Sequence, residues 1–320
     1  MSPPQILIIG SSISGPALAT LLLLTPTSPF LQPHITLLER RPKTHLSAGQ
    51  NIDIRPPGLP VIQLLGLESA VRSATTGEVG VRFVDKDDKV WASFPAMRGG
   101  PTADIEIMRG RLAELLVRRC EDVSADLERR GGRGVEFVYG DYVDELVQDG
   151  EKGKVNVRFA KSGERRSFDI VVGADGLQSS TRKIVWGMDG EEQRVKRLGM
   201  YAAFFSMPAL PKDGLWRRWF HAEGRRGVML RPDVSRNKVT AFMYVINEKD
   251  GRVPKVADRG REDMGSQKAL MAEYFGDVGW ESERVIKEMM GTDDFYYDLV
   301  GQVKMEKWSK GRVVLLGDAG

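Results

Sequence analysis

The N-terminal segment from Gln5 to Leu24 constrains the fold more than any other part of the chain. It begins with the apolar, β-branched run QILII, continues through GSSISG and ends in the apolar run PALATLLLL. An apolar run bounded by proline and glycine is typical of a buried parallel strand, and a helix is expected from about Ser14. A second short strand from His34 to Leu38 leads into Glu39. The segment therefore predicts a strand, helix and strand joined by a right-handed crossover.

Three small residues, Gly10, Ser12 and Gly15, lie between the first strand and its helix. Their spacing resembles a dinucleotide-binding turn, in which Gly10 would turn the chain and Gly15 would let the helix approach the sheet. Ser12 stands where a glycine is usual. Unpaired N–H groups at a helix N-terminus suit a pyrophosphate, and Glu39, 24 residues beyond Gly15, could accept hydrogen bonds from ribose hydroxyls. We interpret the turn as a phosphate cradle.

Composition excludes several classes of partner. A chain of 320 residues with 41% hydrophobic residues can bury a large core, as one domain or two closely joined ones. The 47 basic and 44 acidic residues leave a net charge of only +3, which favours a small-molecule partner over nucleic acid. Cys120 is the single cysteine, and the apolar run from Pro16 to Leu24 is too short to span a membrane. We expect a cytoplasmic protein, and the three histidines show no metal-ligand spacing.

Beyond the first unit, the hydrophobic pattern changes twice. Helices are expected at 57–65 and 109–120, and four short runs between 135 and 172 predict a β-meander. Alternating runs from 194 to 244 predict an antiparallel sheet with one buried face. Helical patterns follow at 262–275 and 280–290, and the chain finishes on an apolar strand that ends in GDAG. These runs predict an α/β fold with a second, sheet-based domain.

Three ordered motifs resemble those of the single-component FAD-dependent aromatic hydroxylases. They are GSSISGP with Glu39-Arg40, the stretch DIVVGADGLQSSTR and the final GRVVLLGDAG. This family includes salicylate hydroxylase, para-hydroxybenzoate hydroxylase and tetracycline-inactivating monooxygenases, and the resemblance runs from residue 5 to the last residue. It implies a Rossmann-like, glutathione-reductase-type FAD-binding parallel sheet with an inserted, mostly antiparallel substrate sheet. The expected borders are 1–190 for the FAD-binding domain with its meander, 191–300 for the substrate domain and 301–320 for a return strand.

The resemblance also implies which residues bind the cofactor. The matching positions are Gly10, Ser12, Gly15, Glu39, Arg40, Arg109, Asp175, Gly176 and Asp318. In the family, the glycine turn holds the FAD pyrophosphate, and Glu39 would bind the adenosine ribose with Arg40 beside it. Arg109 would reach the flavin phosphates, and Asp318 would bond the ribityl or pyrophosphate region. Asp175 and Gly176 match a fingerprint associated with both FAD and the pyridine nucleotide. Arginine suits phosphate oxygens and a carboxylate suits a ribose diol.

The resemblance implies an NAD(P)H- and O2-dependent monooxygenase that hydroxylates or epoxidises an aromatic or polyketide-like molecule through a flavin hydroperoxide. The flavin carries this chemistry, so no side chain is assigned as catalytic acid or base. The alternating sheet would form the substrate wall, although half or more of its large residues have core packing as the simpler explanation. The candidates for this wall are Phe204, Phe205, Trp216, Trp219, Phe220 and Met229. Gln50, Asp53 and Arg55 are weaker polar candidates near the flavin.

Two alternatives stay open. The family pattern continues beyond the Gly-Asp motif into a long helix near the flavin, whereas this sequence stops at Gly320. We therefore expect a truncated member, with a flavin-binding-defective remnant as one alternative. A flavin-dependent oxidase or dehydrogenase of the same fold is the other. A plain NAD(P)-dependent dehydrogenase is disfavoured because that class does not call for the GADG and GDAG motifs. The sequence does not predict the oligomeric state.

Overall fold

A parallel sheet forms the centre of the first half of the molecule. The computed structural model describes residues 2–25, 32–43, 51–97, 100, 103, 105–150, 153–235 and 237–320, with the backbone alone at 261 and 262. The sheet has the order β17-β18-β11-β1-β2-β7. Its strands are β1 (Gln5–Ile9), β2 (His34–Glu39), β7 (Glu136–Tyr139), β11 (Ile170–Gly173), β17 (Ser309–Lys310) and β18 (Val313–Leu315). All neighbours run parallel except β17 and β18, which confirms the predicted Rossmann-like sheet.

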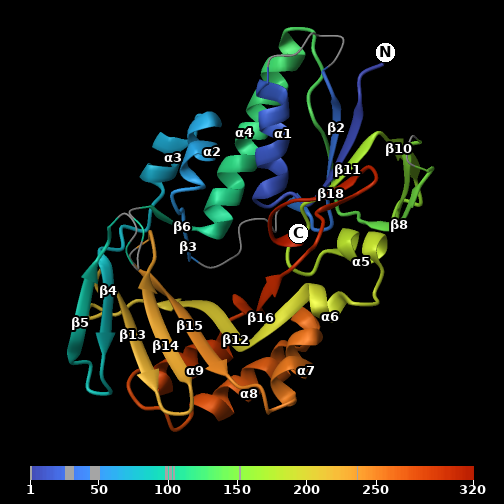
Figure 1. The fold of residues 1–320 in the computed structure, drawn as a ribbon. Coiled ribbons are helices and arrows are strands. Elements are labelled where there is room, and N and C mark those ends of the chain that lie inside the picture. Colours follow the sequence, from blue (N-terminus) through green and yellow to red (C-terminus); the bar gives the residue numbers. More distant parts are fainter. Residues whose placement is uncertain are drawn as a thin grey trace.

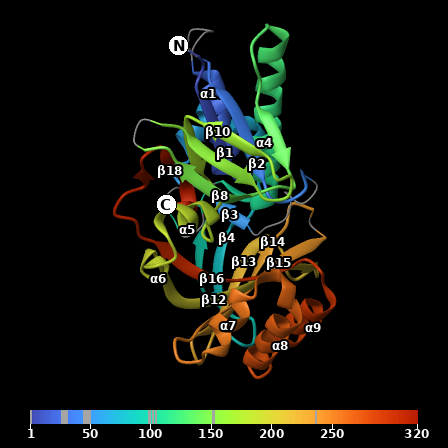
Figure 2. The same cartoon turned by 90° about the vertical axis from the view of Figure 1, so that its right-hand side faces the viewer.

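Two helices cover one face of this sheet, and a small sheet with one short helix covers the other (Figures 1 and 2). Helices α1 (Ser14–Leu24) and α4 (Arg109–Arg129) pack on the first face. The predicted apolar face of the second helix is confirmed, since Leu112, Leu115, Leu116 and Cys120 are all buried. The opposite face carries the three-stranded sheet of β8 (Val143–Gln148), β9 (Val155–Phe159) and β10 (Arg165–Phe168), together with helix α5 (Ser180–Trp186).

The predicted four-stranded meander is only partly correct. The first of its four predicted strands corresponds to β7, which pairs with β2 in the parallel sheet. Its last run is split into β10 and β11, because Asp169 turns the chain from the small sheet into the parallel one. The backbone N–H of Asp169 donates to the carbonyl oxygen of Gln5 at 2.8 Å, and its carboxylate accepts from the N–H of Gln5 at 2.7 Å. Periodicity identified the strands, but not the sheets that they join.

The second large sheet has seven strands in the order β16-β12-β15-β14-β13-β4-β5. These strands are β4 (Gly80–Val84), β5 (Val90–Pro95), β12 (Val195–Pro208), β13 (Trp216–Ala222), β14 (Arg226–Pro232), β15 (Lys238–Ile246) and β16 (Phe295–Val303). All neighbours are antiparallel except β13 and β4. The mostly antiparallel sheet is thus confirmed, and two of its strands come from residues 80–95, ahead of the 191–300 segment from which the sequence predicts it.

Each face of the seven-stranded sheet has a different neighbour. Helices α7 (Arg252–Asp258), α8 (Met264–Phe275) and α9 (Ser282–Gly291) pack on one face around the largest apolar core. The other face is turned toward the parallel sheet (Figure 1). Between the two lie the short strands β3 (Asn51–Asp53) and β6 (Glu106–Met108), with helices α2 (Leu59–Leu64) and α3 (Glu68–Ser73) nearby. In the part of the chain that the structure describes, no helix is both long and apolar enough to cross a membrane.

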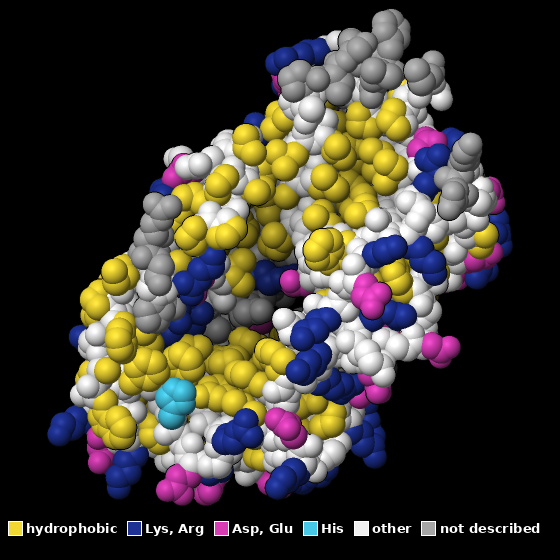
Figure 3. All heavy atoms as spheres, viewed as in Figure 1, with side chains coloured by type: hydrophobic (Ala, Val, Ile, Leu, Met, Phe, Trp, Pro, Cys, Tyr) yellow, Lys and Arg dark blue, Asp and Glu magenta, His cyan; other side chains and the backbone are white. Residues whose placement is uncertain are grey.

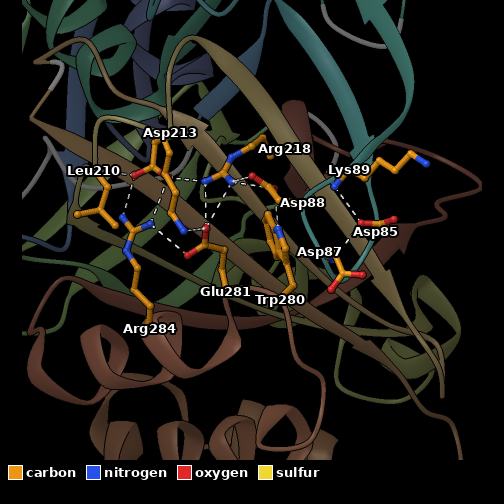
Figure 4. Close-up of polar contacts among 11 residues, drawn as sticks. Asp85, Asp87, Asp88, Lys89, Leu210, Asp213, Arg218, Trp280, Glu281 and Arg284 are labelled. Atoms are coloured by element: carbon orange, nitrogen blue, oxygen red, sulfur yellow. Dashed lines mark hydrogen bonds and ion pairs between the residues drawn. The ribbon is translucent and has the colours of Figure 1, made fainter.

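An ion-pair cluster fixes α9 to the sheet. We call Asp88, Asp213, Arg218, Glu281 and Arg284 the Asp213 cluster (Figure 4). Arg218 pairs with Asp213, with Asp88 at 2.8 Å and with Glu281 at 3.4 Å. Arg284 pairs with Asp213 at 2.8 Å, and Trp280 Nε1 donates to Asp88 at 2.8 Å. The cluster therefore ties the turn between β4 and β5, strand β13 and helix α9 into one unit.

Candidate functional site

Four segments meet at the carboxyl edge of the parallel sheet. Gly10 follows β1, Glu39 ends β2, Asp175 follows β11 and Asp318 follows β18. The N–H of Gly10 donates to the carbonyl oxygen of Leu38 at 2.7 Å. In an open α/β sheet this edge is where ligands bind. Motifs that lie more than 300 residues apart in the sequence therefore converge on one place, as Gly10 and Asp318 show.

The glycine turn after β1 has no room for side chains at its two glycines. Gly10 has φ +110°, and a Cβ there would lie 2.3 Å from the carbonyl oxygen of Ala174. A Cβ on Gly15 would lie 1.9 Å from the carbonyl oxygen of Gly10. Ser12 is half-buried, so a small side chain is accommodated at the middle position. These contacts hold the turn, helix α1 and the loop after β11 together.

The N-terminus of α1 is open to an anion. No side chain caps it, and its first turn contains no acidic residue. An uncapped helix start leaves backbone N–H groups without partners and carries a partial positive charge. Gly317 comes close to this helix start, because a Cβ on Gly317 would lie 2.4 Å from Ser14 Oγ. The Gly-Asp turn after β18 therefore borders the same cradle.

Glu39 holds the glycine turn through its carboxylate. Its Oε2 accepts from the N–H of Ser11 and its Oε1 accepts from the N–H of Arg41, both at 2.9 Å. A carboxylate oxygen has two lone pairs, so both oxygens can accept one more hydrogen bond. Arg40 is exposed and makes no hydrogen bond or ion pair with any residue that the structure describes. The structure thus joins Glu39 to the cradle but does not join Arg40 to it.

Asp175 organises its own loop. Its Oδ1 accepts from Ser179 Oγ at 2.6 Å, and its Oδ2 accepts from the N–H of Thr181 at 2.9 Å and from its Oγ1 at 3.1 Å. Gly176 has φ +77°, and a Cβ there would meet no atom within 4 Å. The carboxylate of Asp175 is therefore engaged inside the loop, while the backbone at Gly176 faces open space.

Ser179 caps helix α5, and we expect Ser179→Ala to lower the free energy of unfolding by about 1 kcal/mol. Its Oγ accepts from the N–H of Arg182 at 2.9 Å, so the substitution leaves that donor unpaired. Urea unfolding measures the loss. The matched control is Ser69→Ala, at an exposed position in α3, with an expected change within about 0.5 kcal/mol. Equal effects of the two substitutions would contradict a specific cap.

Arg182 connects two motifs, and it is not among the residues predicted from the sequence to form the site. It is fully buried, and it donates to the carbonyl oxygens of Leu177 at 2.7 Å and Ala319 at 2.8 Å. It also pairs with Glu191 at 2.7 Å, in the short helix α6 (Glu191–Arg194). Arginine inside a helical pattern usually lies on the surface, so its burial could not be read from periodicity. Its position at the end of the GADGLQSSTR stretch was the available signal.

Arg109 and Asp318 are the two candidates near the cradle that have no partner among the residues that the structure describes. Arg109 begins α4 and is half-buried, one turn before Leu112, which shares an apolar cluster with Ile13 of the glycine turn. Asp318 is exposed in a 3-10 turn (Gly317–Ala319). Neither side chain forms a hydrogen bond or ion pair with a described residue. One positive and one negative side chain are thus available to a ligand that carries both phosphates and hydroxyls.

A hollow separates the parallel sheet from the seven-stranded sheet, and hydrophobic side chains line its lower wall (Figure 3). Of the predicted wall residues, Phe204, Trp219 and Met229 lie on the sheet face turned toward this hollow. Phe205 and Phe220 instead lie in the core under the helices, so their assignment to the wall is wrong. Trp216 is also on that other face, 4.2 Å from the guanidinium of Arg82. Half of the six aromatic and apolar candidates therefore lie on the face opposite the hollow, because side chains alternate between faces along a strand.

A buried charge cluster joins the short strands to the seven-stranded sheet. It consists of Asp53, Glu78, Glu106, Arg217 and Arg231. Arg231 pairs with Glu106 at 2.5 Å and with Glu78 at 3.0 Å, and Arg217 pairs with Glu78 at 2.7 Å. Burial raises the pKa of Glu106, and the nearby charge of Glu78 adds to this against the opposing effect of Arg231. Asp53 lies 3.9 Å from both arginines and also pairs with Arg55, while Gln50 is outside the described residues.

Comparison with known proteins decides the family. A sequence profile described as "FAD binding domain" matches residues 4–320. The FAD-dependent monooxygenase asL6 of Sarocladium schorii is 33% identical over 99% of this chain and 74% of its own length. The chain belongs to the FAD-dependent aromatic monooxygenase family. It is accordingly an oxidoreductase that uses FAD.

Other relatives agree with this assignment. The flavin-dependent monooxygenase eupH of Phoma sp is 31% identical, with coverage of 100% of this chain and 71% of the relative. Among solved structures, tetracycline destructase Tet(55) superposes with a TM-score of 0.76 at 28% identity, over 100% of this chain and 75% of that chain. HpxO of Klebsiella pneumoniae, solved with FAD and uric acid, has a TM-score of 0.69 at 19% identity, over 99% and 73% of the two chains. At that identity the likeness to HpxO shows the fold of the monooxygenase family.

Proposed function

We propose that this monooxygenase uses NAD(P)H and O2 to hydroxylate or epoxidise an aromatic or polyketide-like small molecule in the hollow between its two large sheets. The observation that carries this proposal is the convergence of three motifs on one cradle that faces an aromatic wall. When bound, FAD supplies the redox chemistry that links NAD(P)H and O2 to the substrate. The names of the fungal relatives support a monooxygenase, and the substrate class rests on the wall.

The residues of the cradle fit FAD. We assign the turn Gly10, Ser12 and Gly15 and the open start of α1 to the pyrophosphate, where N–H groups and the helix dipole favour anionic oxygens. Glu39 would accept from the ribose hydroxyls through its remaining lone pairs. The other assigned contacts are Arg109 to phosphate, the backbone of Asp175 and Gly176 to the cofactor, and Asp318 to the ribityl or pyrophosphate region. Arg40 would contact the adenosine end from the surface.

The side chains of this chain would hold the substrate in place and exclude water from it. The apolar wall would bury a planar substrate and keep water away from the reacting atoms, which strengthens every polar interaction there. The buried charge cluster fixes the short strands against the wall, so the two sides of the hollow keep their spacing. A cytoplasmic location is part of the proposal, since it fits a chain with one cysteine.

The first test is the visible absorption spectrum of the purified chain after incubation with FAD and desalting. Retained flavin bands, followed by substrate-stimulated NAD(P)H oxidation and transfer of an ¹⁸O atom from O2 to product, are the expected results. Oxidation of a substrate without ¹⁸O transfer would instead indicate a flavin-dependent oxidase or dehydrogenase. A colourless chain would contradict the cofactor assignment for this chain.

Asp318→Ala separates a cofactor role from a structural one. Because Asp318 is exposed and has no partner among the described residues, the FAD-free chain should keep its free energy of unfolding within about 0.5 kcal/mol. The Kd for FAD should rise about 10-fold, the loss expected for a hydrogen bond to a charged group. Flavin fluorescence titration measures the Kd, and Asp189→Ala provides a surface control. An unchanged Kd would show that Asp318 does not contact FAD.

A further inference from the structure

The wall of the hollow is an ordered set of side chains. Strand register places Tyr296, Phe204, Phe242, Met229, Trp219 and Phe83 in one row across six strands. We call this row the aromatic band. Its rings form two groups on either side of Met229. The centroids are 6.1 Å apart for Phe204 and Tyr296 and 4.6 Å for Phe204 and Phe242 in one group, and 5.3 Å for Phe83 and Trp219 in the other. The band is a mostly apolar, ring-rich surface against which an aromatic ligand can pack.

The next row along the strands has polar side chains at three of its five positions. It contains Asp298, Ala202, Tyr244, Gly227 and His221, in that order across the sheet. Tyr244 Oη and His221 Nδ1 are hydrogen-bonded at 2.8 Å, although Gly227 and its strand lie between them. The His221 ring also stacks on Trp219 of the aromatic band, with centroids 4.9 Å apart. An imidazole is thus held at the edge of the band by a tyrosine two strands away.

Gly227 makes this hydrogen bond possible. A Cβ on Gly227 would lie 2.4 Å from two ring carbons of Tyr244 and 2.5 Å from its hydroxyl oxygen. The tyrosine ring therefore lies across the glycine, in space that any other residue would fill. Gly227 has no positive φ, so its backbone conformation does not require glycine. The close approach of the Tyr244 ring is the physical reason for a glycine at this position.

The pair leaves one polar atom for a ligand. Tyr244 is buried, whereas His221 is exposed, and its Nε2 has no hydrogen-bond partner among the described residues. Partial desolvation of the imidazole against the neighbouring rings lowers the pKa of His221, and burial raises the pKa of Tyr244, so both are neutral near pH 7. A tyrosine hydroxyl can donate to Nδ1 or accept from it. Accordingly Nε2 can donate to a carbonyl oxygen or accept from a phenolic hydroxyl.

We propose that His221, positioned by Tyr244 across Gly227, anchors a phenolic or carbonyl oxygen of an aromatic substrate that stacks on the aromatic band. This inference rests on the proposed function, and it adds a residue that sets substrate orientation and selectivity. Stacking supplies contact area without direction, whereas one hydrogen bond at the edge of the band fixes which end of the ring system lies there. His221 is the binding residue, and Tyr244 and Gly227 are positioning residues.

The test compares 2-naphthol with naphthalene, which differ by the one oxygen atom that the anchor would bind. Equilibrium dialysis against the purified chain gives a Kd for each. We expect 2-naphthol to bind about 10-fold more tightly, and His221→Ala to remove this preference without changing the Kd of naphthalene. His221→Gln, which keeps a donor and an acceptor, should restore part of it. The anchor would be overturned if His221→Ala weakened the binding of both probes equally, or if the preference for 2-naphthol persisted in His221→Ala. It would also be overturned if neither probe bound to the wild-type chain.

Gly227→Ala tests the positioning while the histidine stays in place. The added methyl group displaces the Tyr244 ring, so the preference for 2-naphthol should fall as far as it does in Tyr244→Phe. The control is Gly265→Ala, where a Cβ meets no atom within 4 Å. Flavin absorption is recorded on the same samples. A colourless chain that prefers 2-naphthol contradicts the proposed function alone, whereas a flavin-loaded chain without the preference contradicts the anchor alone.

Discussion

Gly15→Ala is expected to abolish retention of FAD. A Cβ at this position would lie 1.9 Å from the carbonyl oxygen of Gly10, which is backbone and cannot move away as a flexible side chain would. The turn must open, and the N–H groups at the start of α1 then shift away from the pyrophosphate. Overpacking of this kind costs roughly 1–3 kcal/mol. If this free-energy cost is borne by the FAD-bound state, the Kd for FAD rises about 5- to 150-fold, and desalting should yield a colourless chain.

A matched glycine distinguishes the clash from the general effect of losing a glycine in a helix. Gly265 is the second residue of α8, as Gly15 is the second residue of α1, but a Cβ at Gly265 meets no atom within 4 Å. Gly265→Ala should keep FAD bound and raise the free energy of unfolding by about 0.4–1 kcal/mol. Flavin absorption and urea unfolding of both variants give the comparison. Retention of FAD by Gly15→Ala would show that the turn is not the pyrophosphate cradle.

The sequence predicted the cradle better than any other part because its chemistry is local. Glycines at positions 10 and 15 indicate that two backbone segments come close together, and such an approach depends on residues a few positions apart. The end of each parallel strand is also marked by a glycine or an acidic residue. Since parallel strands share one carboxyl edge, the motifs that contain Asp175 and Asp318 had to meet there once the strands were recognised.

The pairing of strands into sheets and the burial of charged residues were harder to predict from the sequence. Strands β4 and β5 lie in the seven-stranded sheet, and β7 pairs with β2. The alternation of apolar and polar residues in these strands does not predict which strand each one pairs with. The buried charge cluster was missed for a related reason. Arg217 and Arg231 occupy positions that face solvent in most amphipathic strands, and their partner Glu78 lies more than 130 residues away in sequence. Only the fold shows that these charges neutralise one another.

Arg218→Met is expected to lower the free energy of unfolding by about 3 kcal/mol, the lower end of the cost of breaking a buried ion pair. Arg218, Asp213 and Glu281 are almost completely buried (Figure 4). Among the described residues, Arg284 is the one charged partner that Asp213 keeps after the substitution. Urea unfolding followed by tryptophan fluorescence reports the change, because Trp280 lies beside the cluster. The control is Arg197→Met. Its ion pair with Asp258 is exposed, so the expected cost is under about 1 kcal/mol.

The pH dependence of the stability lost in Arg218→Met shows whether the loss comes from the ion pair. Burial by itself opposes ionisation of Asp213, but hydrogen bonds from Arg284 and from the N–H of Leu210 outweigh it, so the pKa lies below the usual range. The stabilisation is therefore complete above the unfolded-state pKa of about 3.9 and is lost as the pH falls through the folded-state value. The difference between wild type and Arg218→Met should shrink below about pH 4, because a protonated carboxyl no longer needs the guanidinium. A difference that stays constant down to about pH 3 would instead assign the loss to packing of Arg218 against Trp280, 5.3 Å from the ring centroid.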